Sequence, residues 1–205
     1  MSPTSTEHAP AVAPPARVFV GLKIAPEVAT KLAQIVATLE ELPLRLVKPD
    51  DIHLTLVSPW NETSIRDAIE KLRAAVSGIG AFSLILQHVG YGPRPGRPRL
   101  IWADCAASDE ITALRVHLLQ AFGQTEEHPF QPHVTLARFR ANGPAIARRH
   151  PIDQQLSLTQ RVESVELFQS PPPGGVGYRV LASLRLRETR RLRADGIEFP
   201  QTANA

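Results

Sequence analysis

Apolar residues along the chain follow two spacings, one typical of strands and one typical of helices. Short stretches rich in Val, Ile, Leu and Phe are bounded by Pro or Gly, as strands buried on at least one face are. Between several of these stretches, apolar residues recur at intervals of three and four, which places them on one face of a helix. The pattern predicts strands at residues 17–24, 44–48, 53–58, 82–91, 98–105, 134–139, 156–170 and 177–187.

Three amphipathic helices are predicted between these strands. Pro26 suits the first turn of the first helix, and Asn61 and Ser108 are expected to cap the second and third. Residues 141–155 have no clear pattern beyond a short helix expected at 146–149. The three apolar faces consist of Val28, Leu32, Ile35 and Leu39; of Ile65, Ile69, Leu72 and Val76; and of Ile111, Leu114, Leu118 and Phe122.

The order of the elements favours the α+β class with antiparallel or mixed sheets. Several strands follow one another as hairpins, and no strand is followed by a Gly-rich phosphate loop. Residues 1–16 contain four prolines and neither Lys nor Arg, and residues 188–205 are polar with clustered arginines. We expect both segments to be tails, so the folded unit is expected to span residues 17–187.

Composition limits the location and the partners of the protein. In 205 residues, no apolar stretch approaches the ~20 residues that a membrane-spanning helix needs. The first residues also lack the cationic and apolar regions of a signal peptide. We therefore expect a cytoplasmic protein without a membrane partner. We also expect it to be a monomer. The single cysteine excludes an internal disulfide.

The positive charge is carried mainly by arginine. The net charge is only +3, but 19 of the 23 cationic residues are Arg and four are Lys. Arginine binds phosphate through two parallel hydrogen bonds, whereas lysine acts more as a point charge. A phosphate-bearing partner is one interpretation, and a coding bias towards arginine is the other.

Two nearly identical tetrapeptides lie 80 residues apart, His53-Leu54-Thr55-Leu56 and His133-Val134-Thr135-Leu136. Each lies in an apolar, strand-like segment that follows a Pro-containing stretch. Alternation along a strand places the His and the Thr of each motif on one face and the aliphatic residues on the other. Two such strands side by side present two imidazoles and two hydroxyls to a shared cleft.

This set of side chains suits displacement at phosphorus. One imidazole takes a proton from the nucleophile and the other gives a proton to the leaving oxygen, and an ordinary pKa near 6.5 lets both forms coexist. The hydroxyls can donate hydrogen bonds to the phosphate oxygens. Two histidines without a nearby carboxylate are a poor zinc set, so no metal and no cofactor is expected.

The paired motifs resemble those of the two-histidine (2H) phosphoesterase superfamily, and most closely its RNA 2′,3′-cyclic phosphodiesterase or 2′-5′ RNA ligase-like branch. The resemblance covers residues 17–187. It also rests on the first strand, on a Pro/Arg loop before a Trp-containing strand, and on the flanks of the second motif. The matching segments are residues 18–22, 52–56, 93–102, 129–138 and 178–181.

The resemblance implies a bilobal fold, in which two β-sheet lobes related by a pseudo-twofold axis carry helices outside and the His pair in the central cleft. It implies hydrolysis of the 2′,3′-cyclic phosphate at an RNA end to a 2′-phosphate. His53 is then the proton donor and His133 the proton acceptor, although near-symmetric motifs leave these roles exchangeable from sequence alone. The resemblance also matches Arg138 to a family arginine expected to bind phosphate with Thr55 and Thr135.

Two positions complicate this interpretation. Strict alternation points Arg138 to the face opposite His133, where it would form a surface salt bridge, unless a bulge turns it inward. Ser58 stands where the family often has an aromatic residue that stacks on a base, and Trp60 is a possible substitute. Arg94, Arg97 and Arg99 form either an RNA-backbone contact or a solvated turn, and His88, His117, His128 and His150 are expected to be structural or exposed.

Three functions remain open at this point. The first is a metal-independent RNA 2′,3′-cyclic phosphodiesterase whose partners are RNA ends. The second keeps the site but acts on small cyclic-phosphate nucleotides, or joins RNA through the reverse 2′-5′ ligation. The third is an RNA-end binding protein without turnover, which the intact His and Thr of both motifs argue against.

Overall fold

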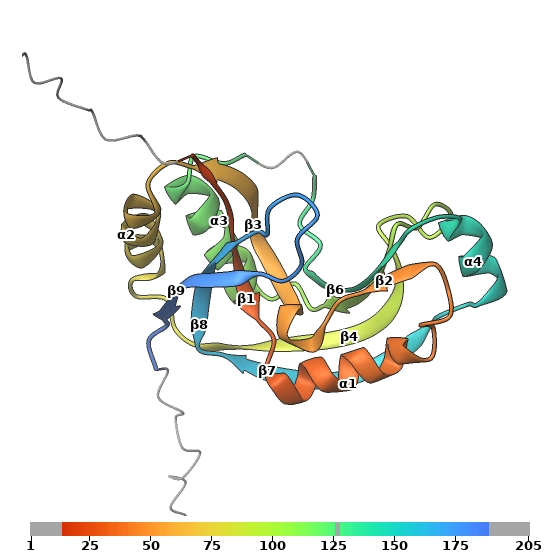
Figure 1. Ribbon diagram of the computed structural model, residues 1–205. Coiled ribbons are helices and arrows are strands. Elements are labelled where there is room, and N and C mark those ends of the chain that lie inside the picture. Colours follow the sequence, from red (N-terminus) through yellow and green to blue (C-terminus); the bar gives the residue numbers. More distant parts are fainter. Residues whose placement is uncertain (1–13, 126–127, 189–205) are drawn as a thin grey trace, which may run out of the picture.

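The computed structural model describes residues 14–125 and 128–188, which contain nine strands in one sheet, four α-helices and one 3₁₀ helix (Figure 1). None of the helices in this part of the chain has the length and apolar character needed to cross a membrane. The elements in chain order are β1 (Ala16–Lys23), α1 (Pro26–Ala37), β2 (Leu44–Leu46), η1 (Pro49–Asp51), β3 (His53–Glu62), α2 (Ile65–Val76), β4 (Phe82–Gly92), β5 (Leu100–Cys105), α3 (Asp109–Ala121), β6 (His133–Phe139), α4 (Gly143–Arg149), β7 (Gln154–Val162), β8 (Ser164–Gln169) and β9 (Arg179–Arg185).

The sheet consists of two halves that meet at one pair of residues. The strand order is β7-β4-β5-β6-β3-β1-β8-β9, with β2 beside β6, and the named strands pair antiparallel. Strands β6 and β3 pair only through Leu54 and Val134. We call β7, β4, β5, β6 and β2 the β6 half, and β3, β1, β8 and β9 the β3 half. The α+β class is confirmed, and both halves belong to one sheet.

Neither half is a continuous segment of the chain. The β3 half contains β1 and β3 from the start of the chain and β8 and β9 from its end. The β6 half contains β2 and the four consecutive strands β4, β5, β6 and β7. From the junction outward, each half has a motif strand first and three further strands after it. A pseudo-twofold relation requires this order, and the symmetry itself stays a prediction.

Helices α1, α2 and α3 cover the apolar side of the sheet. Helix α1 contacts β2, β6 and β7, whereas α2 and α3 pack together and contact strands of the β3 half (Figure 1). Leu54 and Val134 at the junction are fully buried. Because neighbouring side chains of a strand point to opposite faces, the residues on either side of this pair point away from that core. The buried helix residues are Val28, Ala29, Leu32 and Val36 in α1; Ala68, Leu72 and Val76 in α2; and Ile111, Leu114 and Leu118 in α3.

The second helix begins later than the sequence predicts. Strand β3 continues through Pro59 to Glu62, and Ser64 caps α2 by accepting a hydrogen bond from the backbone N–H of Asp67 at 3.3 Å. The predictions of a strand end at residue 58 and a cap at Asn61 were therefore wrong. A bulge in the pairing with β1 spans Pro59, and a bulge is a place where a strand tolerates proline.

The predicted strand at residues 156–170 is two strands. Strand β7 ends at Val162 and pairs with β4, whereas β8 begins at Ser164 and pairs with β1. The apolar pattern continues across Glu163, so it does not indicate that the chain passes there from the β6 half of the sheet to the β3 half. The remaining predicted strands and helices are present with small shifts at their ends. The expected tails lie outside the described residues, apart from residues 14–16 and 188.

Candidate functional site

The two motif histidines occupy equivalent places in the two halves. His53 and His133 are the first residues of β3 and β6. His53 is paired with Lys23 of β1, and His133 is paired with Asp104 of β5. In both strands the burial pattern begins half-buried, buried, half-buried, buried, buried. The two tetrapeptides therefore have the same local structure as well as nearly the same sequence.

The pairing at the junction brings the two motifs together. Because Leu54 lies opposite Val134, the antiparallel register places His53 across from Thr135 and Thr55 across from His133. The two histidines are then diagonal neighbours, and such positions stand about 7–8 Å apart. One phosphate group between the two rings spans such a gap. The register therefore brings together the His and Thr side chains of both motifs, and their role as one site stays a prediction.

A bulge brings Arg138 to the same face as His133. Ala137 is paired with Ile101, and Thr135 with Trp102, so Leu136 is an extra residue in β6. Leu136 and Ala137 are consecutive buried residues, after which Arg138 is exposed. The bulge reverses the alternation, and the positive charge of Arg138 lowers the pKa of both His53 and His133. Of the two orientations that the sequence left open, the structure has the inward one.

Both imidazoles are held by a backbone carbonyl two residues earlier. The Nδ1 atom of His53 lies 2.7 Å from the carbonyl oxygen of Asp51, and that of His133 lies 2.8 Å from the carbonyl oxygen of Gln131. A carbonyl oxygen only accepts hydrogen bonds, so each Nδ1 carries the proton. When either ring is neutral, its Nε2 has the free lone pair. Both rings therefore offer Nε2 for proton transfer.

Aromatic rings pack against each histidine. The His53 ring lies 4.8 Å from Phe19, 4.8 Å from Tyr178 with its edge in a T-shaped contact, and 5.6 Å from Phe168. The His133 ring lies 4.3 Å from Trp102. These contacts restrict the rotation of both rings and remove water from one side of each.

Burial lowers the pKa of both imidazoles below the ordinary value of 6.5. The carbonyl hydrogen bonds partly oppose this effect, because they favour the protonated ring. The neighbours distinguish the two residues. The charge of Asp104 raises the pKa of His133. The charge of His133 lowers the pKa of His53, and the charge of Asp51 raises it.

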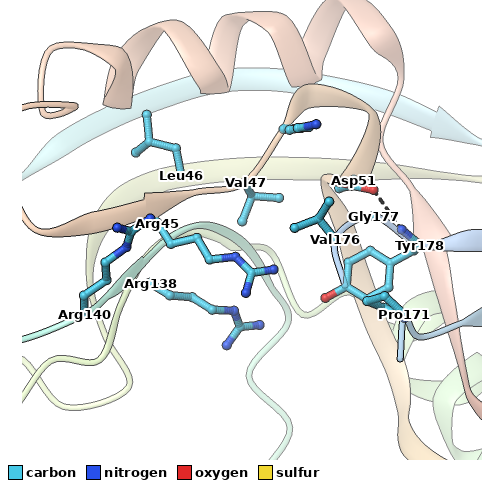
Figure 2. A pocket seen from close by; sticks show the side chains of 11 residues that line it. Arg45, Leu46, Val47, Asp51, Arg138, Arg140, Pro171, Val176, Gly177 and Tyr178 are labelled. Carbon is cyan, nitrogen blue, oxygen red and sulfur yellow. Dashed lines mark hydrogen bonds between the residues drawn. The ribbon is translucent and has the colours of Figure 1, made fainter. Parts of the chain in front are cut away.

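A cationic hollow adjoins the histidine pair. It has a volume of about 280 Å³ and lies between β2, β6, the η1 helix and the β8–β9 loop. It shares Arg138 and Asp51 with the site just described. Figure 2 shows the guanidinium groups of Arg45 and Arg138 near each other, with the Tyr178 hydroxyl turned towards them. The charged residues that line it are Arg45, Lys48, Arg138, Arg140 and Asp51.

Other expected site residues lie elsewhere. Trp60 packs against Phe122 at 4.8 Å and donates a hydrogen bond to Glu62, so its ring is engaged away from the two histidines. Ser58 is exposed and follows two consecutive buried residues in β3, just as Arg138 follows two consecutive buried residues in β6. It therefore occupies the position in the β3 half that Arg138 occupies in the β6 half.

The Arg-rich loop and His88 lie on the β6 half. Arg94, Arg97 and Arg99 line a separate hollow of about 860 Å³ together with Phe130. His88 lies 2.7 Å from a carboxylate oxygen of Asp153 and 3.5 Å from one of Asp104. The described residues contain no group of three or more His, Cys, Asp or Glu side chains placed to hold a metal ion.

Sequence reasoning did not find several residues of the site. Asp51 and Gln131 act through backbone carbonyls, which any residue type supplies, but their matched spacing of two residues before each His was a usable signal. Arg45 enters because β2 pairs with β6, with Arg45 opposite Arg138. Tyr178 enters through a loop 125 residues beyond His53, and no periodicity in the sequence predicts that contact.

Known proteins are similar to this chain in both sequence and fold. A model of the 2′-5′ RNA ligase superfamily matches residues 49–171, an interval that contains both motifs. A protein of Aeropyrum pernix named RNA 2′,3′-cyclic phosphodiesterase is 30% identical over 140 residues, which are 63% of this chain and 78% of that protein. A protein of the same name from Bacillus subtilis is 29% identical over 158 residues, covering 74% and 86%.

Solved structures extend the likeness to the whole fold. The crystal structure of TT0787 of Thermus thermophilus is 26% identical, with a TM-score of 0.69, and covers 84% of this chain and 98% of that one. E. coli LigT complexed with 3′-AMP has a TM-score of 0.65 at 21% identity, over 84% of this chain and 98% of that one. At this identity LigT supports the fold alone.

Proposed function

The chain belongs to the 2′-5′ RNA ligase superfamily, and from this premise we propose that it is an RNA 2′,3′-cyclic phosphodiesterase. Its substrate is an RNA end that carries a 2′,3′-cyclic phosphate, and its product is a 2′-phosphate. The names of the relatives from Aeropyrum pernix and Bacillus subtilis support this substrate class. The observation that carries the proposal is the matched pair of imidazoles with Nδ1 bound to a carbonyl and Nε2 free.

The reaction is an in-line displacement at phosphorus. His133 accepts a proton from water through Nε2, and the water oxygen forms a bond to phosphorus. The bond from phosphorus to O3′ breaks, and His53 donates its Nε2 proton to that oxygen. The product has a 2′-phosphate and a free 3′-hydroxyl, so the protons balance: one is taken up by His133 and one is given by His53.

The electrostatic surroundings support this assignment of roles. Burial lowers the pKa of both rings, and a nearby carboxylate partly offsets this for each, Asp51 for His53 and Asp104 for His133. Arg138 lowers the pKa of both rings, whereas the charge of His133 lowers the pKa of His53 without an equivalent effect on His133, which favours His53 as the acid. The negative charge of a bound phosphate favours the protonated form of His53 before the reaction.

The remaining side chains stabilise the phosphate. Thr55 and Thr135 lie on the same face as the histidines, where their hydroxyls donate to the non-bridging oxygens. Arg138 adds a guanidinium that is suited to two hydrogen bonds with one phosphate. Each of these groups contributes most where negative charge accumulates in the transition state.

The test is end-group analysis after incubation with an oligonucleotide that ends in a 2′,3′-cyclic phosphate, in the presence of EDTA. We expect the product to be a 2′-phosphomonoester, identified by phosphorus NMR. His133→Ala should remove the activity, and His117→Ala should not, because His117 is an exposed residue of α3 outside the site. An unconsumed cyclic phosphate, a 3′-phosphate product or a requirement for a divalent ion would overturn the proposal.

A further inference from the structure

Two arginines lie directly opposite each other on neighbouring strands. In the antiparallel pairing of β2 with β6, Arg45 faces Arg138, and both side chains are exposed on the wall of the cationic hollow. Like charges opposite each other destabilise a pair of strands. An anion bound between the two guanidinium groups would remove this repulsion.

The hollow contains more positive charge than its own residues neutralise. Arg45, Lys48, Arg138 and Arg140 line it, and Asp51 is the one acidic residue among the described residues of its wall. One carboxylate oxygen of Asp51 already accepts a hydrogen bond from the backbone N–H of Tyr178 at 3.0 Å. The four cations have no carboxylate partner within residues 14–125 and 128–188. The charge is therefore available to a ligand.

The size and the charge of the hollow suit a phosphate group. Its volume of about 280 Å³ is near the lower limit of small-molecule pockets, and it has room for a phosphate group. Guanidinium groups bind phosphate oxygens in pairs. Figure 2 shows the phenol of Tyr178 facing the arginines from the β8–β9 loop, where its hydroxyl can donate one further hydrogen bond.

The position of the hollow relates it to the reacting group. Arg138 is close enough to both catalytic imidazoles to affect their pKa values, and it also lines the hollow. The carbonyl of Asp51 holds His53, while its carboxylate holds the loop that forms the opposite wall. A ligand in the hollow thus lies one side chain away from the phosphate that reacts.

We propose that this hollow binds a second phosphate of the substrate, the one attached to the 5′ oxygen of the nucleotide that carries the cyclic phosphate. This inference rests on the proposed function and deepens it. The enzyme then distinguishes an RNA end, or a 5′-phosphorylated nucleotide, from a cyclic mononucleotide without a 5′-phosphate. Arg45 and Arg140 are binding residues of this subsite, and Arg138 is shared with the reacting phosphate.

The test compares three substrates that all carry a terminal 2′,3′-cyclic phosphate. The first is a nucleoside 2′,3′-cyclic phosphate, the second is a dinucleotide, and the third is the same dinucleotide with an uncharged methylphosphonate in place of its internucleotide phosphate. We expect kcat/KM to be about ten-fold or more higher for the dinucleotide than for the other two. Adding a 5′-phosphate to the first substrate should restore most of the difference.

Arg45→Gln and Arg140→Gln identify the site that recognises this charge. Each should reduce kcat/KM for the dinucleotide about ten-fold more than for the methylphosphonate, because only the charged linkage contacts the guanidinium. Arg73→Gln is the matched control, since Arg73 is an exposed arginine of α2 whose side chain lies 3.5 Å from Glu70. We expect Arg73→Gln to leave the ratio of the two substrates unchanged.

Salt dependence gives an independent measurement. Salt screens the attraction between a phosphate and exposed arginines. The affinity of the dinucleotide should therefore fall more steeply with salt concentration than that of the methylphosphonate, and Arg45→Gln should reduce this difference. This readout does not depend on whether the variant slows the chemical step.

The outcomes separate this inference from the proposed function. If none of the cyclic phosphates is hydrolysed, the proposed function fails. If all are hydrolysed with equal kcat/KM, or if Arg45→Gln lowers every substrate equally, the phosphodiesterase stands and the second phosphate site is overturned. If both Arg45→Gln and Arg140→Gln still hydrolyse the dinucleotide faster than the methylphosphonate by the same factor, the second phosphate site is also overturned. The hollow lined by Arg94, Arg97 and Arg99 would then be the next site to test.

Discussion

Replacing Gly21 by alanine should disturb the junction between the two halves of the sheet. Gly21 lies in β1, where it is paired with Thr55 on one side and Glu166 on the other. A Cβ atom at this position would lie 2.5 Å from the backbone carbonyl oxygen of Leu54. Ordinary van der Waals contact begins at 3.4 Å, so β3 must move away from β1 by about 0.9 Å.

The displaced residue is the one that joins the halves. Leu54 is the partner of Val134, and its neighbours His53 and Thr55 belong to the proposed catalytic set. Overpacking of a core costs about 1–3 kcal/mol. At ~2–4 °C per kcal/mol for a chain of this size, the melting temperature should fall by about 2–12 °C. A displacement near 1 Å in a catalytic group can cost about 10²-fold in rate.

Two measurements test this prediction. Thermal unfolding gives the change in melting temperature, and kcat/KM on a cyclic-phosphate oligonucleotide gives the effect on the site. Gly96→Ala is the matched control, because no atom lies within 4 Å of a Cβ placed there. If Gly21→Ala were as stable and as active as Gly96→Ala, the close approach of β1 and β3 would not position the site.

The proposed catalytic residues give four further expectations. His53→Ala or His133→Ala should lower kcat/KM by about 10²–10⁴-fold in steady-state assays. The double variant should be little less active than either single variant, because both rings are proposed to act on one phosphate. Losses that multiply in the double variant would contradict this. Thr55→Val and Thr135→Val should each reduce kcat about ten-fold or more, since a donor to transition-state charge contributes up to ~3–4 kcal/mol, with circular dichroism checking the fold. Burial lowers the pKa of both imidazoles below 6.5, so kcat/KM should peak on the acid side of that value, and a peak above about pH 7 would contradict the pairing. With these lowered pKa values the unfolded chain binds more protons than the folded one, so stability should fall as the pH drops below 6.5, and His53→Gln should weaken that dependence in thermal melts.

The sequence predicted the elements of the fold because their patterns are local. The spacing of Val28 and Leu32 in α1 is a property of one helix, and the alternation in each motif is a property of one strand. The same reasoning missed the end of β7, because the break at Glu163 depends on two different partner strands. It also chose Asn61 as a cap, because the bulge that lets β3 pass Pro59 depends on the pairing with β1.

The site was predictable to the extent that it repeats. Two copies of one motif place His and Thr on one face, and this argument needs no knowledge of the neighbours. The orientation of Arg138 depends on a bulge that forms against β5, so the sequence left two orientations open. Arg45 and Tyr178 belong to the site only through pairings and loops that join distant parts of the chain, and local periodicity does not report such contacts.

The interleaved order of the strands has a consequence for synthesis. Strands β1 and β3 leave the ribosome roughly 100 residues or more before β8 and β9, so the edge of β1 that later pairs with β8 stays open during most of translation. An open edge of this kind can pair with other chains. Contacts between segments so far apart also form slowly. We therefore expect a truncated or slowly translated chain to aggregate rather than accumulate as a half-sized folded unit.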